Sequence, residues 1–345
     1  MSPTPADSSV PVSAAASVHP ATVLLDAQAS AQRLPVCDHY SGVELRMRKS
    51  LQLQAEMTQE FGTCVFDVTL DCEDGAPVGD EAAHASLVAS LARDAAPGAR
   101  VAARVHAVDH PAFAQDMATI VGEASHRLSH IMVPKVESVD DVLLAEKALE
   151  RASGSHLPLH VLIESPAAIY RAFEIAAHPR VQSISFGLMD FVSAHGGAIP
   201  ASAMGSQGQF EHPLVVRAKL EIAAACHAHG KVPSHCVVTE FKDPDLMQAA
   251  ASRAAREFGY TRMWSIHPGQ IRSILAAFAP AQQEVDQAAY ILQSAAAVHW
   301  APISADGVLH DRASYRYYWQ LLERAHQTGR SLPASVQPWF ASPSL

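Results

Sequence analysis

Eight apolar segments, each followed by a stretch of helical periodicity, constrain the fold of this chain most strongly. They read as continuous apolar runs more than as alternating polar and apolar positions, which is typical of a parallel sheet covered on both faces. Eight strand–helix repeats over about 250 residues predict an α/β fold, a (β/α)₈ TIM barrel. The expected strands are residues 34–40, 63–71, 99–107, 130–136, 159–165, 183–189, 232–238 and 262–268. The expected helices are residues 44–60, 80–94, 111–125, 139–152, 167–177, 214–229, 243–258 and 270–279.

An open, doubly wound sheet is the competing architecture for such an alternation. That fold carries a Gly-rich G-x-G-x-x-G turn after its first strand, and this chain has none there. The barrel is therefore the preferred interpretation.

The pattern divides the chain into three parts. Residues 1–30 are rich in Ala, Ser, Pro and Val and predict a disordered extension. Residues 31–280 form the predicted catalytic barrel. Residues 281–345 exceed what a barrel needs and predict a C-terminal helical lid or oligomerisation tail, with a turn or hairpin around Asp306–Gly307. The aromatic residues of this tail favour a docked segment over a free one.

Composition narrows the classes of partner. The formal net charge is −10, which argues against a nucleic-acid or anionic-membrane surface. The five cysteines are widely spaced and include no C-x-x-C pair, so we expect a reducing cytoplasm and mostly buried thiols. No apolar run approaches 18 residues and no basic segment opens the chain, so neither a membrane span nor a signal peptide is expected.

Charged residues gather where the predicted strands end. In a barrel these ends meet at one mouth, where catalytic groups lie. Acids outnumber bases in this set, so structural ion pairs do not account for all of them. The set comprises Glu73, Asp74, Arg104, Lys135, Glu164, Asp190 and His267.

Glu164 and Asp190 stand out because each is a lone acid at the end of an apolar run. Oxygen-only ligands favour a hard ion, so we expect Mg²⁺, with Mn²⁺ as an alternative. The competing reading is a buried acid bonded to the backbone. The chain's 19 histidines show no metal-ligand spacing.

Arg104 offers a planar, two-pronged donor that suits a carboxylate or carbonyl oxygen of a substrate. Its structural alternative is an ion pair with Glu73 or Asp74. Arg104 can fill both roles if an acid on the side away from the substrate holds the guanidinium in position.

An ordered set of motifs carries a family resemblance over residues 64–325. The motifs are L-D-C-E-D-G-A-P (70–77), R-V-H (104–106), I-M-V-P-K-V-E-S (131–138), I-E-S-P-A-A-I (163–169), F-G-L-M-D-F (186–191) and S-I-H-P-G-Q-I (265–271). In this set the chain resembles the citrate lyase β-subunit/malyl-CoA lyase family, the CoA-ester lyases of the HpcH/HpaI aldolase superfamily. The resemblance implies a (β/α)₈ barrel that assembles as a homotrimer or homohexamer.

The resemblance also implies roles for individual residues. Glu164 and Asp190 match the Mg²⁺ ligands and Arg104 matches the substrate-binding arginine. Glu73 and Asp74 match acids that line the site and orient that arginine. Asp311 matches the second Asp of a D-G-x-x-x-D lid segment, which reaches a neighbouring subunit's active site as an acid/base. Lys135 and His267 fall in family motifs and are expected to bind substrate.

The implied activity is that of a Mg²⁺-dependent carbon–carbon (oxo-acid) lyase. It cleaves or forms a short 3-hydroxyacyl-CoA, such as malyl-, citramalyl- or citryl-CoA, and gives a 2-oxo acid plus acyl-CoA by retro-aldol/Claisen chemistry. Two alternatives stay open: a metal-dependent pyruvate-type aldolase acting on a free 2-oxo acid, and a non-catalytic acyl-CoA-binding barrel. The chain departs from the family pattern at D-H-Y-S-G (38–42) and at His106, where an Asn is usual.

The expected action of Asp311 in a neighbouring subunit is testable by mixing two inactive variants. Arg104→Ala and Asp311→Ala subunits, co-refolded, should regain part of the lyase activity because mixed oligomers contain some intact sites. The measurement is cleavage of the thioester before and after mixing. Absence of any recovery would contradict action in trans.

Overall fold

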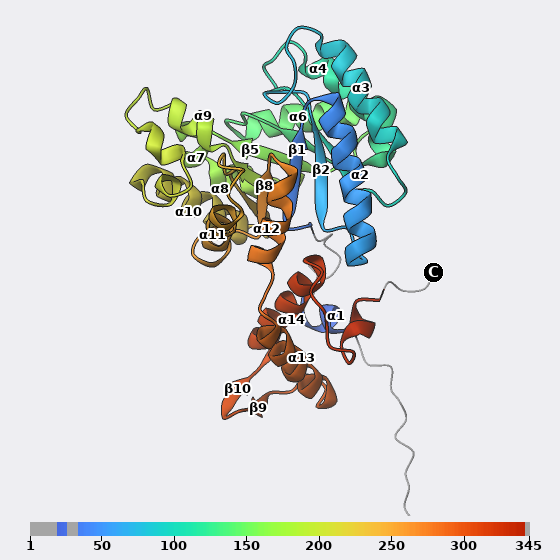
Figure 1. Cartoon of the computed structure of the whole chain (residues 1–345), viewed down its shortest axis with the longest axis vertical. Helices are drawn as coiled ribbons and strands as arrows, with labels where there is room; N and C mark the ends of the chain where they lie inside the picture. The colour runs from blue at the N-terminus through green and yellow to red at the C-terminus, as the bar shows by residue number, and fades with distance from the viewer. Residues whose placement is uncertain (1–18, 26–33, 342–345) are drawn as a thin grey trace, which may run out of the picture. The chain divides into compact units, whose positions relative to one another are not determined.

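The computed structural model describes residues 19–25 and 34–341, and the central element is a closed barrel. Eight parallel strands pair in chain order, and β8 closes the ring on β1 (Figure 1). This confirms the predicted (β/α)₈ TIM barrel. The strands are β1 Cys37–Ser41, β2 Phe66–Asp71, β3 Val101–Arg104, β4 Leu128–Val133, β5 Leu159–Ile163, β6 Val181–Phe186, β7 Val232–His235 and β8 Arg262–Ser265.

Helices follow every strand of the barrel. They are α2 Glu44–Phe61, α3 Glu81–Asp94, α4 Phe113–Asp116, α5 Gly122–Ala124, α6 Val139–Arg151, α7 Pro166–Tyr170, α8 Ala172–Ala177, α9 Leu188–Ser193, α10 Pro213–Ala228, α11 Pro244–Arg256 and α12 Pro268–Phe278. A π-helical turn, Met117–Val121, joins α4 to α5. Helix α9 was not anticipated: its first residues were assigned to the sixth strand, which ends at Phe186.

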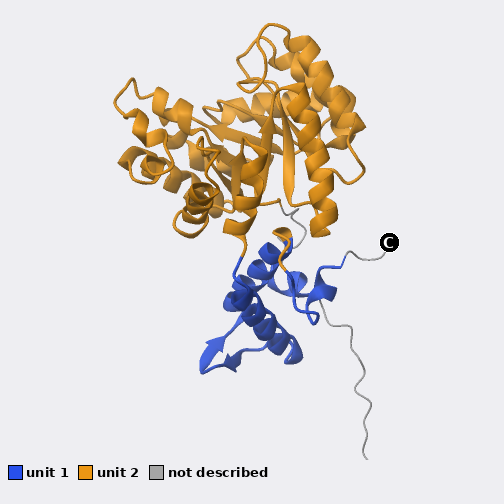
Figure 2. Ribbon diagram, in the orientation of Figure 1, with its two compact units in different colours: residues 1–32, 280–326, 331–345 blue, residues 33–279, 327–330 orange. Residues whose placement is uncertain are grey.

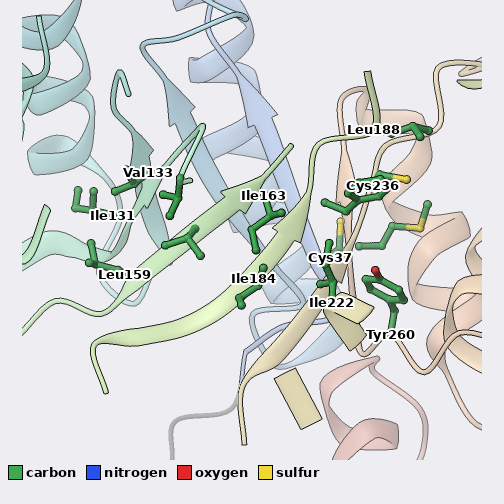
Figure 3. Close-up of a cluster of buried hydrophobic side chains, with 14 of the residues drawn as sticks. Cys37, Ile131, Val133, Leu159, Ile163, Ile184, Leu188, Ile222, Cys236 and Tyr260 are labelled. Carbon is green, nitrogen blue, oxygen red and sulfur yellow. The ribbon is translucent and has the colours of Figure 1, made fainter. Parts of the chain in front are cut away.

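The outward faces of the strands form the main hydrophobic core against the helices. On β4 and β5 every second residue, such as Ile131, Val133, Leu159 and Ile163, lies in this core and is fully buried (Figure 3). Burying a side chain of this size contributes about 1.5–3 kcal/mol, so the outer layer dominates the folding free energy. Helices rich in Ala pack closely on it.

The inward-facing residues are arranged in layers along the barrel axis. Along β5 and just after it, the inward-facing residues are polar His160, apolar Leu162 and charged Glu164. The apolar middle layer is a small separate cluster of Tyr40, Met132, Leu162 and Trp264. Below it, on the N-terminal side, lies a polar layer of Asp38, Asp67, His130, His160 and Arg262.

Arg262 organises the polar layer. Its Nη2 donates to Asp67 at 2.6 Å and lies 2.8 Å from Asp38 Oδ2. Arg100 at the start of β3 also donates to Asp67, at 2.5 Å. Two acids therefore face two arginines, and the layer is neutral when its histidines are neutral. Leaving one partner out of such a buried set costs far more than an exposed pair contributes.

His130 and His160 are stacked inside this layer, with ring centroids 3.5 Å apart and planes within 16° of each other. Both are fully buried. Burial lowers the pKa of His160 to about 3, with Arg262 adding to the effect, although a hydrogen bond to Gln182 opposes it. Burial likewise holds the pKa of His130 well below its usual value.

The chain forms two compact units (Figure 2). One comprises residues 33–279 and 327–330, and the other residues 1–32, 280–326 and 331–345. The second unit contains α13 Gln282–Ala297, the antiparallel hairpin β9 Ile303–Ala305 and β10 Val308–His310, and α14 Arg312–Gln327. The hairpin turns at Asp306–Gly307, both with positive φ, which confirms the expected hairpin.

A short N-terminal helix, α1 Pro20–Leu24, belongs to this second unit. Leu24 and Leu25 are buried with Trp319 and other apolar residues of α13 and α14. The prediction of disorder for residues 1–30 is therefore wrong for this segment, because its leucines find an apolar surface distant in sequence. The rest of the predicted extension lies outside the described residues.

The structure bears on two expectations from composition, one on the cysteines and one on membrane-spanning helices. The five cysteines are free, and all but the partly exposed Cys64 are buried, which confirms mostly buried thiols. Among the described residues, no helix combines the length and apolarity needed to cross a bilayer.

The neutral histidines of the polar layer predict acid sensitivity. His160 takes up a proton in the unfolded chain below about pH 6.5, but in the folded chain only near pH 3. Unfolding free energy should therefore fall with pH in this window by about 1.4 kcal/mol per pH unit from this residue. The unfolding free energy, measured in urea between pH 6.5 and pH 4, should depend less steeply on pH in His160→Gln than in wild type. The exposed His126→Gln is the control, and equal slopes for His160→Gln and wild type would contradict the argument.

Candidate active site

Arg104 and Asp71 form the rigid centre of the barrel mouth. They are the last residues of β3 and β2 and are direct partners in the strand register. Arg104 donates to Asp71 from Nε at 2.7 Å and from Nη2 at 2.5 Å, a two-pronged pair. Burial alone would lower the pKa of Arg104, but Asp71 and Glu73 outweigh it and raise that pKa. Arg104 therefore stays charged in a site with little access to water.

The Asp71 carboxylate also shapes the loop that follows β2. Besides the two arginine donors, it accepts the backbone N–H groups of Glu73 and Gly75, each at 2.9 Å. A Cβ at Gly75 would lie 2.3 Å from Asp71 Oδ2, so only glycine allows this approach. One buried carboxylate thus fixes both the arginine and the L-D-C-E-D-G loop.

Glu73 links Arg104 to Lys135. Its Oε2 lies 3.0 Å from Arg104 Nη1, and its Oε1 accepts from Lys135 Nζ. Burial would raise the pKa of Glu73, but the charges of Arg104 and Lys135 lower it. Asp74 is more exposed and its carboxylate lies 3.7 Å from Lys135. Glu73 is thus one of the two partners expected for Arg104, whereas the described hydrogen bonds and ion pairs do not join Asp74 to it.

Glu164 directly follows β5 and is 5% exposed. Its Oε1 accepts a hydrogen bond from the backbone N–H of Lys135 at 2.8 Å. Lys135 has a left-handed backbone conformation, with φ 52°. A Cβ at Gly187 would lie 2.5 Å from Glu164 Oε2, so the glycine keeps this oxygen free of a clash.

Asp190 meets Glu164 from a helix. It lies in the first turn of α9, not at the tip of β6 as expected, because the chain bends into the helix after Gly187. Burial, and then the neighbouring charge of Asp190, raise the pKa of Glu164 to about 8. The two carboxyl groups are close enough to share a hydrogen bond.

This carboxylate pair fits a hard divalent cation. Two acids that share a proton are mutually repelling when both are ionised, and a cation between them removes that repulsion. The donors are oxygens only, and two carboxylates leave positions for water and substrate, as Mg²⁺ prefers.

A second group of possible metal ligands lies in the polar layer, below the apolar middle layer. It comprises Asp38, His130 and His160. The stacked, nearly parallel imidazole planes do not let both rings direct a lone pair at one ion. The layer also already balances its acids with Arg100 and Arg262. A divalent ion would add uncompensated buried charge, so we assign no metal to this group.

The structure gives His267 and Asp311 local roles at helix starts. His267 precedes α12, and its Nδ1 accepts the Gly269 N–H at 3.1 Å. Asp311 belongs to the other compact unit, where its Oδ1 accepts the Ala313 N–H at 3.0 Å at the start of α14. Their expected contacts with substrate remain predictions.

Asp71 is the residue of the mouth that the sequence pattern did not single out. Arg104 was expected to pair with Glu73 or Asp74, not with Asp71. The polar residues Asp67, Thr69 and Asp71 alternate along β2 and so share one face. That periodicity, with Arg104 at the end of the next strand, is the signal that identifies the pair.

Comparison with known proteins gives a consistent family. Residues 51–268 match the model of the HpcH/HpaI aldolase/citrate lyase family. A curated relative, the L-malyl-CoA/beta-methylmalyl-CoA lyase of Cereibacter sphaeroides, is 31% identical over 244 residues. That match covers 65% of this chain and 75% of the relative.

Solved structures agree with the fold. A citrate lyase from Burkholderia xenovorans LB400 is 48% identical, with a TM-score of 0.76 over 94% of this chain and 100% of that one. Protein CitE from Mycobacterium tuberculosis, in complex with magnesium, acetoacetate and coenzyme A, has a TM-score of 0.63 over 85% of this chain and 98% of its own. At 21% identity, the latter supports the fold alone.

The carboxylate pair predicts a direct effect on cation binding. Asp190→Ala should weaken Mg²⁺ binding by more than about tenfold, because one of two charged ligands is lost. Isothermal titration calorimetry measures the affinity, and circular dichroism should show an unchanged fold. Asp109→Ala, which removes an exposed acid elsewhere on the mouth, is the control. Equal Mg²⁺ affinity in Asp190→Ala and wild type would rule out this site.

Proposed function

Because the chain belongs to the HpcH/HpaI aldolase/citrate lyase family and is a carbon–carbon lyase, we propose that it cleaves a short 3-hydroxyacyl-CoA. The substrate class is that of malyl-, citramalyl- and citryl-CoA, and the products are a 2-oxo acid and a shorter acyl-CoA. The reverse reaction is a condensation of the same two products.

One observation carries the proposal. A charged, rigid Arg104 and an oxygen-only carboxylate pair are linked through Lys135, whose Nζ binds Glu73 and whose N–H binds Glu164. A 2-oxo acid product has a carboxylate beside a ketone oxygen. The arginine suits its carboxylate, and the cation-binding pair suits the adjacent oxygens.

Glu164 and Asp190 are the residues that would hold Mg²⁺. The bound ion would supply a concentrated positive charge that stabilises negative charge developing on oxygen. Since Glu164 retains a proton up to about pH 8 beside Asp190, ion binding is coupled to proton release from this pair.

Arg104 binds the substrate carboxylate with the donors that Asp71 leaves free. A guanidinium has five N–H donors: Asp71 uses that of Nε and one of Nη2, and Glu73 lies against one of Nη1, which leaves one on each terminal nitrogen. Glu73 and Asp74 line the site beside it, and Lys135 and His267 contribute further substrate contacts. A base removes the hydroxyl proton, the carbon–carbon bond breaks, and an acid protonates the resulting thioester enolate.

Asp311 of a neighbouring subunit is the proposed acid, in a cytoplasmic homotrimer or homohexamer. In this chain Asp311 follows the β9–β10 hairpin, whose Val308 and Leu309 are exposed apolar residues. An exposed apolar hairpin next to an acid is suited to insertion into another subunit.

The defining experiment is a screen of purified protein with malyl-, citramalyl- and citryl-CoA in the presence and absence of Mg²⁺. We expect Mg²⁺-dependent release of glyoxylate, pyruvate or oxaloacetate with acetyl-CoA, because the retro-aldol step needs both the cation and the thioester. Product formation is followed by trapping the 2-oxo acid as its phenylhydrazone. Asp190→Ala is the matched inactive control.

Activity on free hydroxy-oxo acids with silence on all three thioesters would replace this proposal with the pyruvate-type aldolase. Binding of acyl-CoA without turnover of either class would indicate the non-catalytic barrel.

A further inference from the structure

A buried Asp–His pair lies at the mouth outside the groups used above. Asp116, the last residue of α4, accepts with Oδ2 from the backbone N–H of His106 at 2.9 Å and contacts the ring Nδ1 at 2.6 Å. Asp116 is 1% exposed, so this geometry is shielded from solvent. Both contacts converge on one oxygen and hold the ring and its backbone together.

The partner determines which ring nitrogen carries the proton. A carboxylate oxygen that already accepts a backbone N–H offers only a lone pair, so Nδ1 donates to it. In neutral His106 the other nitrogen, Nε2, then bears a free lone pair. Among the described residues, no hydrogen bond involves Nε2. An adjacent His110 stacks on the ring at 4.2 Å and limits its tilt.

His106 faces a cleft of about 450 Å³ on the C-terminal side of the barrel. The loop after β2, the loop after β3 and Lys135 enclose this cleft. Two of its lining residues are Glu73, which contacts Arg104, and Lys135, whose N–H binds Glu164. His106 therefore lines the same cleft as Glu73 and Lys135, the residues that contact Arg104 and Glu164.

We propose that His106 is the base that takes the hydroxyl proton of the substrate, with Asp116 as its positioning residue. This inference rests on the proposed lyase function and assigns a residue to its first proton transfer. The arrangement of carboxylate, Nδ1–H and free Nε2 is the one by which an imidazole is oriented for proton transfer in hydrolases. A loop-capping role alone would use only the backbone N–H bond to Asp116.

Proton transfer to His106 is coupled to cleavage of the carbon–carbon bond. Nε2 takes the hydroxyl proton, and the O–H electron pair becomes the second bond of the new ketone. The electrons of the broken carbon–carbon bond move to the α-carbon of the thioester as an enolate. An acid delivers one proton to that carbon and regains one from solvent, to which His106 releases the proton that it took. One hydroxyacyl thioester thus gives one 2-oxo acid and one acyl thioester without a net change in protons.

Several charged groups face His106 and enter any pH dependence. Asp116, Asp109 and His110 come from its own connection. Other titratable groups of the cleft come from neighbouring elements: Cys72, Glu73, Asp74, Glu81 and Lys135. Burial raises the pKa of Cys72 well above its usual value, so this thiol does not compete as a base.

The test compares His106→Asn and Asp116→Asn with His126→Asn, an exposed histidine outside the cleft. Asparagine retains a hydrogen-bond donor towards Asp116 but transfers no proton. In steady-state thioester cleavage, His106→Asn should lower kcat by about 100-fold or more, with KM within about threefold. The dependence of kcat/KM on acidic pH should differ between His106→Asn and wild type. Asp116→Asn should lower kcat comparably because an amide favours the wrong tautomer. The exposed His126→Asn, in the turn before β4, should stay within about threefold of wild type.

A His106→Asn variant with wild-type kcat and an unchanged pH profile would overturn the inference while leaving the lyase function intact. A second readout does not depend on turnover. In protein labelled with ¹⁵N-histidine, the ring-nitrogen shifts of His106 at pH 8 should show a protonated Nδ1 and an unprotonated Nε2, and Asp116→Asn should change them. The opposite tautomer in wild type overturns the inference. Inactivity of wild type on every thioester instead refutes the proposed function.

Discussion

The ion pair between Asp71 and Arg104 is the interaction on which the mouth of this barrel depends. Asp71 accepts four donors, two from the guanidinium and two from the following loop. Replacing either partner removes the two-pronged pair and leaves Arg104 with Glu73 alone, or Asp71 with two backbone N–H groups alone, which is costly for a buried charge. The loop therefore has one conformation only while the arginine is present, and the arginine has one direction only while the loop is folded. Strand register supplies this coupling, since the two residues are neighbours across β2 and β3.

The pKa values of the carboxyl groups at the mouth differ because their surroundings differ. Near Arg104 the acids have partners and lowered pKa values, as in Asp71 and Glu73. A few residues away, Glu164 meets another acid and its pKa rises to about 8. Such separation of similar groups by environment is how one site provides both fixed charges and proton-exchanging groups. The uncompensated pair is the place where the proposed cation would stabilise the site.

The repeating pattern of the sequence was sufficient for the barrel, because each strand–helix unit repeats the same signal eight times. Glu164 and Arg104 were identifiable for the same reason, since each ends an apolar strand. Asp190 was identified as a residue but misplaced, because Gly187 ends the strand and a six-residue helix is too short for a periodicity signal. The partnership of Asp71 with Arg104 and the Asp116–His106 pair depend on register and loop geometry. His130 and His160 stack through the tilt of neighbouring strands, which a linear sequence does not display.

The apolar middle layer of Tyr40, Met132, Leu162 and Trp264 has a consequence for how this protein can vary. It separates the salt-bridged floor of the barrel from the charged mouth, and among the described residues no hydrogen bond or ion pair joins Asp38, Asp67 or Arg262 to the charged groups of the mouth. The floor and the outer core stabilise the fold, whereas the residues at the mouth carry the proposed chemistry. A lineage that carries this partition is free to exchange rim residues, and so to try new substrates, while its scaffold stays constant.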